Sequence, residues 1–113
     1  MPVPEAGKKI AVTVGSWEGV ADGPHRFGGV EFRVGRREVG DVHGDSLVDI
    51  PFSKTVRDEL IQAGVAEPHH VLPKSGWVSV HLRNLDDVER AIQLLRKSYE
   101  IARQSQIERT QSG

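Results

Sequence analysis

The chain has 113 residues, with 15 Lys and Arg against 16 Asp and Glu, and it contains no cysteine. This length predicts a single domain over residues 1–113 with an ordered core over about 8–104, and the near-zero net charge argues against nucleic acid as a partner. The absence of cysteine excludes disulfides, thiolate zinc sites and a thiol nucleophile. Because no stretch resembles a signal peptide or the roughly 18 apolar residues of a membrane span, we expect a cytoplasmic protein without a membrane partner.

The first apolar pattern lies in residues 8–18 and fits two local structures. Ile10, Val14 and Trp17 have the spacing of one helix face, whereas Ile10, Val12 and Val14 alternate as in a strand. We favour a short amphipathic helix, because Trp17 extends the helical stripe.

After a connection from Gly19 to Pro24, the chain predicts three antiparallel strands joined by two tight turns. Apolar and polar residues alternate from Val30 to Val34, as in a half-buried strand. Gly35-Arg36 and Gly44-Asp45 suit two-residue hairpin turns, because glycine accepts the positive φ needed at the first turn position. We therefore expect a three-stranded meander that ends near Ile50.

These turns set an expected register between the strands. The expected facing pairs are Arg33 with Glu38, Phe32 with Val39, Val39 with Ile50, Asp41 with Val48, and His43 with Ser46. Alternation then places one apolar set on the core face of the sheet, namely Val30, Phe32, Val34, Val39, Val48 and Ile50.

Asp41 and His43 fall on that mostly apolar face, toward the end where His25 and Gly28-Gly29 lie. A carboxylate buried there needs hydrogen bonds, a cationic partner or a metal ion. The alternative is an Asp-His pair that satisfies itself at the rim of the sheet. A shift of one residue in register would turn both side chains to solvent.

A helix is expected after the meander. Ser53 or Thr55 can cap it, and Thr55 to Asp58 resembles a capping box. Its expected buried stripe comprises Val56, Leu60 and Ala63, and Gly64 is a natural stop. We expect this helix to cross one face of the sheet.

Two prolines bracket the adjacent histidines His69 and His70, so the segment 67–76 is expected to be an extended, rigid surface segment. Alternation from Trp77 to Leu82 predicts a further strand that joins the sheet. Asn84 then caps the longest predicted helix, whose buried stripe comprises Val88, Ala91, Ile92, Leu95, Tyr99 and Ala102.

The order of these elements predicts an α+β fold. We expect an antiparallel sheet, made of the three-stranded meander and at least one further strand, with two or three helices packed on one face. The last helix is expected to fray from Gln104 onward. The sequence sets no oligomeric state.

Four separated motifs carry a family resemblance. They are the stretch from His25 to Gly40, Val-His-Gly-Asp at 42–45, Glu-Pro-His-His-Val-Leu-Pro at 67–73, and Ser-Gly-Trp-Val-Ser at 75–79. In this order they resemble the bacterial luciferase-domain family, from about Trp17 to Tyr99. That family shares a domain with fungal luciferases, which oxidise a hydroxylated pyrone luciferin with molecular oxygen, but its small single-domain members have no agreed activity.

The resemblance bears on one candidate ligand. Members of the family often have a histidine where this chain has Asp41, which would give a His-x-His pair with His43. The chain departs from that pattern, although aspartate is itself an acceptable metal ligand.

A weaker likeness concerns architecture. Trp77-Val-Ser-Val and the helical sequence from Leu94 to Glu100 are similar to small YjbR-type proteins, which implies a frataxin-like α+β fold. Some of those proteins are linked to DNA binding, so nucleic acid is kept as an alternative partner.

Five histidines, at positions 25, 43, 69, 70 and 81, are the main chemical signal. Neutral imidazoles and a carboxylate can hold a divalent metal ion, and three protein ligands with one open position form a catalytic centre. His25, Asp41 and His43 are the candidate metal ligands. The alternative is that the histidines are capping, surface or core-edge residues.

A pocket that binds a small ligand at a histidine-rich sheet edge is the function we favour. Its candidate residues are His25, Phe27, Asp41, His43, His69, His70 and Trp77. Its catalytic versions are a metal-dependent oxygenase and a cofactor-free oxygenase with histidine as general base. Core packing is the alternative role for the two aromatic residues.

An interaction module is the third hypothesis. Three arginines cluster near one hairpin, namely Arg33, Arg36 and Arg37. They could bind a phosphate or an acidic partner. The alternative is a solvated turn in which these arginines pair with Glu31 and Glu38.

Overall fold

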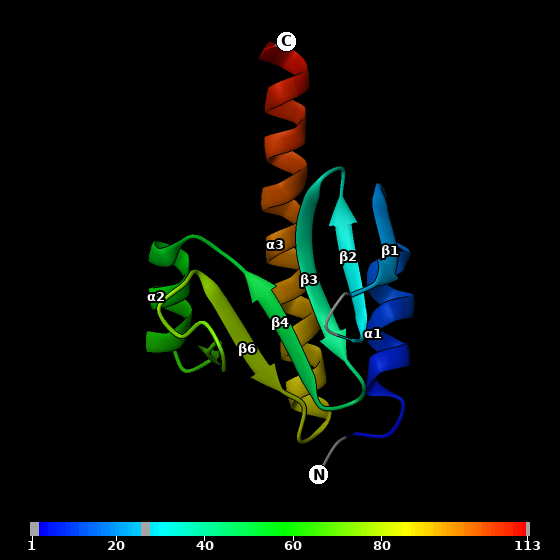
Figure 1. Ribbon diagram of the computed structural model, residues 1–113, viewed down its shortest axis with the longest axis vertical. Coiled ribbons are helices and arrows are strands. Elements are labelled where there is room, and N and C mark those ends of the chain that lie inside the picture. The colour runs from blue at the N-terminus through cyan, green and yellow to red at the C-terminus, as the bar shows by residue number, and fades with distance from the viewer. Residues whose placement is uncertain (1–2, 26–27, 113) are drawn as a thin grey trace.

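The computed structural model describes residues 3–25 and 28–112, which form one antiparallel sheet and three helices (Figure 1). The strands are β1 (Val20–Pro24), β2 (Val30–Val34), β3 (Arg37–His43), β4 (Leu47–Pro51), β5 (Glu67–Pro68) and β6 (Trp77–His81), in the sheet order β1-β2-β3-β4-β6-β5. The helices are α1 (Ala6–Gly15), α2 (Lys54–Gln62) and α3 (Leu85–Ser112). This arrangement confirms the predicted α+β class.

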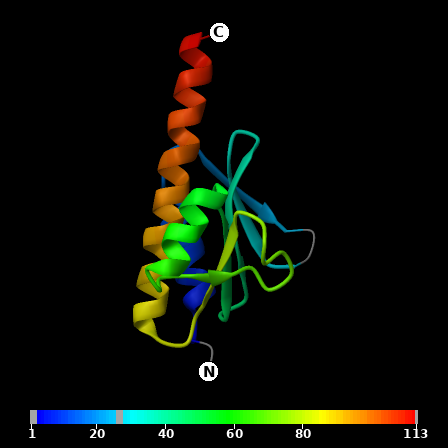
Figure 2. The same ribbon diagram turned by 90° about the vertical axis from the view of Figure 1, so that its left-hand side faces the viewer.

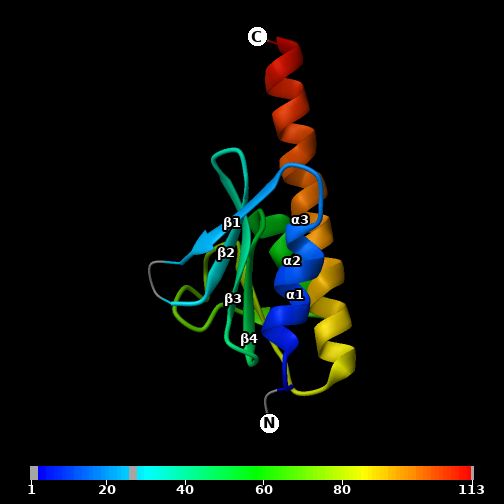
Figure 3. The same cartoon turned by 90° about the vertical axis from the view of Figure 1, so that its right-hand side faces the viewer.

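The sheet has two unlike faces. Helices α1 and α3 cover one face, while the connection between β5 and β6 lies on the opposite side (Figures 2 and 3). The side away from α1 and α3 is called the open face below. The core lies between the sheet and these two helices, where Ile10, Val14 and Leu95 are fully buried. No described helix is both long and apolar enough to cross a membrane.

The N-terminal segment is helical, as the stripe of Ile10 and Val14 predicts. Trp17 follows the helix and its ring packs on Tyr99, with the ring centroids 5.2 Å apart. The expected connection from Gly19 to Pro24 was wrong, because Val20–Pro24 forms strand β1 and pairs with β2. Alternation alone did not reveal this edge strand, since Asp22, Gly23 and Pro24 are poor strand formers.

The first hairpin contains a β-bulge. Arg33 pairs with Glu38 as predicted, but Phe32 pairs with Gly40 and not with Val39. Val39 is the extra residue of the bulge, and both Val39 and Gly40 are buried toward the helices. Every residue after Gly40 on β3 therefore points to the face opposite to the predicted one.

The second hairpin also differs from the prediction. Asp41 pairs with Asp49 and not with Val48, and His43 pairs with Leu47 and not with Ser46, because the turn spans residues 44–46. Val42 takes the buried position opposite Val48. Asp41 and His43 accordingly lie on the open face, so their predicted place on the core face was wrong.

The remaining elements are set mainly by local signals. Ser53 caps α2 by accepting a hydrogen bond from the Val56 amide. Helix α2 contacts β5 and β6 and has no fully buried residue, so it lies by the edge of the sheet and does not cross it as predicted (Figure 1). The Asn84 side chain accepts a hydrogen bond from the Asp87 amide, which confirms the predicted cap of α3. The expected fraying from Gln104 was wrong, because the helix continues to Ser112.

Candidate functional site

A row of three acidic residues and one serine crosses the open face. Glu31, Asp41, Asp49 and Ser79 are directly opposite one another on β2, β3, β4 and β6. Like charges directly opposite on neighbouring strands repel each other, and Asp41 and Asp49 are only 2% and 3% exposed. Among the described residues, every ion pair of these two aspartates is with a histidine. The row therefore destabilises the fold unless positive charge lies close to its carboxylates.

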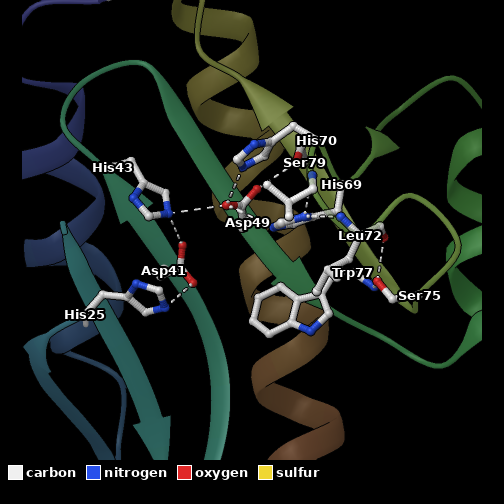
Figure 4. A network of polar contacts seen from close by, with 11 residues as sticks. His25, Asp41, His43, Asp49, His69, His70, Leu72, Ser75, Trp77 and Ser79 are labelled. Atoms are coloured by element: carbon white, nitrogen blue, oxygen red, sulfur yellow. Dashed lines mark hydrogen bonds and ion pairs between the residues drawn. The ribbon is translucent and has the colours of Figure 1, made fainter. Parts of the chain in front are cut away.

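The first cluster consists of His25, Asp41 and His43 (Figure 4). The Nε2 atom of His43 lies 2.6 Å from Oδ1 of Asp41, and that of His25 lies 3.4 Å from Oδ2. Despite the short contact, Oδ1 is buried without a hydrogen-bond partner among the described residues. One ligand atom from each of the three residues lies within 4.8 Å of the other two, so they can converge on one ion.

The second cluster surrounds Asp49. Oδ1 of Asp49 accepts a hydrogen bond of 2.6 Å from the Ser79 hydroxyl. The Nε2 atoms of His43, His69 and His70 lie 3.3, 3.4 and 3.5 Å from Oδ2 of Asp49 (Figure 4). Because these contacts are longer than good hydrogen bonds, Asp49 is surrounded by imidazoles without being tightly bonded to any of them.

His69 is held as a hydrogen-bond donor and not as a metal ligand. Its Nδ1 atom accepts hydrogen bonds from the backbone amides of Val71 and Leu72, at 3.1 and 3.0 Å. Burial lowers the pKa of His69 below its usual value, which favours the neutral ring. A neutral ring whose Nδ1 accepts must carry its hydrogen on Nε2, the atom that faces Asp49. Between the two clusters, this favours the first as the metal site.

Glu38 belongs to the same face, although the sequence did not single it out. Burial, a hydrogen bond with Asp41 and the nearby carboxylates together raise the pKa of Glu38 to about 7. Burial also raises the pKa of Asp41 to about 6, with the charges of Asp49 and Glu31 adding to the effect and the hydrogen bond from Glu38 opposing it. Two carboxyl groups in contact hold a proton between them unless a cation takes its place.

The other predicted site residues are placed as follows. The Trp77 ring meets the edge of the His69 ring, with centroids 5.9 Å apart, and His69 stacks on His70 at 4.5 Å. Phe27 lies outside the described residues. His81 is away from both clusters and pairs with Glu67 at 3.2 Å.

The arginine cluster of the first hairpin has partners on the protein itself. Arg33 is ion-paired with Glu31 and donates to the Arg36 carbonyl, and Arg37 reaches the Ser105 hydroxyl at 3.4 Å. These contacts fit a solvated turn. Binding of a phosphate or an acidic partner there stays a prediction.

Several hollows of the described surface lie away from these clusters. One of about 420 Å³ is lined by α1 and the start of α3, including Val12, Leu85 and Val88. Its walls are aliphatic with Lys8, Lys9 and Glu5, and no histidine lines it. The reactive side chains are gathered on the open face, so we place the candidate site there.

Comparison with known proteins supports a family but no specific relative. No curated protein and no solved structure matches the chain. The model of the luciferase domain matches residues 36–98, which include Asp41, His43, Asp49, His69, His70 and Trp77. This match covers more than half of the 113 residues and confirms the resemblance seen in the sequence motifs. The chain belongs to the luciferase domain family.

Proposed function

We propose that this domain binds a small ligand on the open face through one divalent metal ion held by His25, Asp41 and His43. The observation that carries the proposal is the buried Asp41 carboxylate, which lies between two imidazole Nε2 atoms and has an oxygen without a hydrogen bond. A metal ion would satisfy that oxygen and offset the repulsion within the acidic row.

The donor set suits a catalytic type of centre. Two histidines and one carboxylate leave coordination positions open, as in metallohydrolases with zinc and in non-haem iron(II) oxygenases. A bound ion would act there as a Lewis acid toward a ligand atom. Asp49 and the Nε2–H of His69 lie beside His43 and would orient polar groups of that ligand.

The test is thermal unfolding of the whole chain in EDTA and then with Zn²⁺, Mn²⁺ or Fe²⁺. Ligand at a hundred times its Kd adds about 2.7 kcal/mol to stability, which raises the Tm of a domain of this size by roughly 10 °C. We expect that rise in the wild type and in His81→Ala, whose imidazole pairs with Glu67 outside the site. His43→Ala should lose it. A wild type that no metal stabilises, or a full rise in His43→Ala, would contradict the proposal.

An oxygenase is the second candidate function. The two-histidine, one-carboxylate donor set favours it, because this is the set of iron(II) sites that bind oxygen at open positions. Nitric oxide is a stable substitute for oxygen at such sites. After addition of nitric oxide, the iron(II)-loaded protein should give the high-spin EPR signal of an iron-nitrosyl adduct. An iron(II)-loaded protein without that signal would contradict the oxygenase hypothesis but not metal binding.

A further inference from the structure

The bulge in β3 brings together two carboxylates that a regular strand would separate. Residues three positions apart in a strand point to opposite faces. Because Val39 is an extra residue between the Arg33–Glu38 and Phe32–Gly40 pairs, Glu38 and Asp41 share the open face. Bulges often re-aim a side chain next to a functional site.

When both are ionised, Glu38 and Asp41 each present a buried oxygen that receives no hydrogen bond from the described residues. Oε2 of Glu38 is buried without a hydrogen-bond partner among the described residues, as is Oδ1 of Asp41. Ligand atoms of Glu38, Glu31 and His25 lie within 4.8 Å of one another, and His25 also belongs to the first cluster. Glu31 is already neutralised by its ion pair with Arg33, which leaves Glu38 as the available carboxylate next to His25.

We propose that Glu38 is a further ligand of the ion held by His25, Asp41 and His43, and that it favours oxygen-preferring ions such as Mn²⁺ and Fe²⁺. This inference rests on the proposed function. Zinc is satisfied by three protein ligands and one water in a tetrahedron, whereas Mn²⁺ takes more ligands and prefers carboxylate oxygens. Loss of one carboxylate should therefore affect Mn²⁺ more than Zn²⁺.

The experiment compares Glu38→Gln with Glu31→Gln, which removes the same charge from the same face but leaves the proposed ligands intact. Affinities of the full chain for Mn²⁺ and Zn²⁺ are measured by competition with a fluorescent chelator. We expect Glu38→Gln to weaken Mn²⁺ binding by about tenfold or more and Zn²⁺ binding by less than about threefold. Glu31→Gln should change both by less than about threefold.

The visible absorption of the Co²⁺-loaded protein gives a readout of ligation itself. Its intensity rises as the coordination number falls, so Glu38→Gln should absorb more strongly than the wild type and Glu31→Gln should not. Urea unfolding of each metal-free variant checks that both are folded.

Three results would overturn the inference. They are unchanged Mn²⁺ affinity in Glu38→Gln, equal losses in Glu38→Gln and Glu31→Gln, and an unaltered Co²⁺ spectrum. Each of them would leave metal binding by His25, Asp41 and His43 in place. A wild type that binds no metal would instead reject the proposed function and this inference together.

Discussion

Asp41 is a residue whose environment is poor for stability. It lies opposite Asp49, is 2% exposed, and has only histidines as ion-pair partners among the described residues. Asp87 is the opposite case, because it is also buried but accepts hydrogen bonds from the Arg83 amide and the Arg90 side chain. The environment of Asp41 therefore suits the binding of a cation, whereas that of Asp87 stabilises the folded chain.

Replacing each aspartate by asparagine should separate these roles. In EDTA at neutral pH, Asp41→Asn should equal or exceed the wild type in free energy of unfolding by up to about 1 kcal/mol, because a repulsion between like charges is removed. Asp87→Asn should lose about 1–3 kcal/mol, because a buried hydrogen-bonded charge is lost. Urea unfolding measures both. Similar losses in the two variants would show that Asp41 is a structural residue.

The raised pKa of Glu38 predicts how the metal-free protein responds to pH. A carboxyl group with a pKa of 4.5 in the unfolded chain and about 7 in the folded one binds more protons when folded. Its stabilising contribution is complete below pH 4.5 and is lost as the pH rises to about 7. The Asp41 shift, from 3.8 to about 6, acts with the same sign.

The comparison is with Glu38→Gln, which cannot titrate at that position. Between pH 4.5 and about 7 the wild type should lose stability relative to this variant in EDTA, as measured by urea unfolding. Parallel pH profiles of the two proteins would contradict the assigned pKa. Burial of His69 lowers its pKa and acts in the other direction, but equally in both proteins.

At the scale of elements, the β3 bulge is held by helix α3. The Ser98 hydroxyl donates a hydrogen bond of 2.8 Å to the Val39 carbonyl, and both residues are fully buried. Gly40 also lets the helix approach closely, because a Cβ there would lie 2.6 Å from the end of the Leu95 side chain and 3.0 Å from the Asp49 carbonyl. The element that shapes the candidate site is therefore fixed from the opposite side of the sheet.

Ser98→Ala should test this support. The change removes a hydrogen bond from the buried Val39 carbonyl, which should cost about 1–3 kcal/mol in the free energy of unfolding. It should also weaken Mn²⁺ binding, because Glu38 and Asp41 depend on the bulge for their alignment. Ser105→Ala, at a half-buried position farther along α3 where Arg37 contacts the helix, is the control, with a change within about 0.5 kcal/mol. Equal stabilities of the two variants would show that the bulge does not need Ser98.

The same bulge explains which parts of the fold could be predicted from the sequence and which could not. Caps, turn glycines and helical stripes are local signals, so the helices, β6 and the Arg33–Glu38 pair were predicted correctly. The bulge depends on Ser98 and on Leu95, which are far from Gly40 in the chain.

The candidate site shows the same limit. Because the prediction lacked the bulge, it placed Asp41 and His43 on the wrong face and did not identify Glu38 as a site residue. Asp49 was missed as well, because its place beside Asp41 needs the three-residue turn. The histidines were found because their number and neighbours are visible in the sequence.

At the scale of the whole molecule, the two faces of the sheet divide structure from the candidate function. Helices α1 and α3 bury the aliphatic core on one face, and the carboxylates and histidines are gathered on the other (Figures 3 and 4). Changes far from the open face should therefore alter stability without altering metal binding, unless they act through a support such as Ser98.

The end of α3 provides a test of this separation. The helix extends past the sheet (Figure 1), and no side chain described between Arg103 and Arg109 is fully buried, whereas Ala102 is. Beyond Arg103 the described links to the sheet are exposed ones, such as Arg37 to Ser105. A chain that ends at Arg103 should keep its free energy of unfolding within about 1 kcal/mol and its metal affinity within about twofold.

A chain that ends at Ser98 is the contrasting variant. It also loses the Tyr99 hydroxyl bond of 2.6 Å to the Glu18 carbonyl and the burial of Tyr99 and Ala102, so we expect it to be several kcal/mol less stable. If the chain ending at Arg103 lost as much free energy of unfolding, the projecting part of the helix would have to pack against another surface in solution. Because the described chain offers little for it to pack on, a concentration-dependent loss of stability would then point to a second copy of the chain.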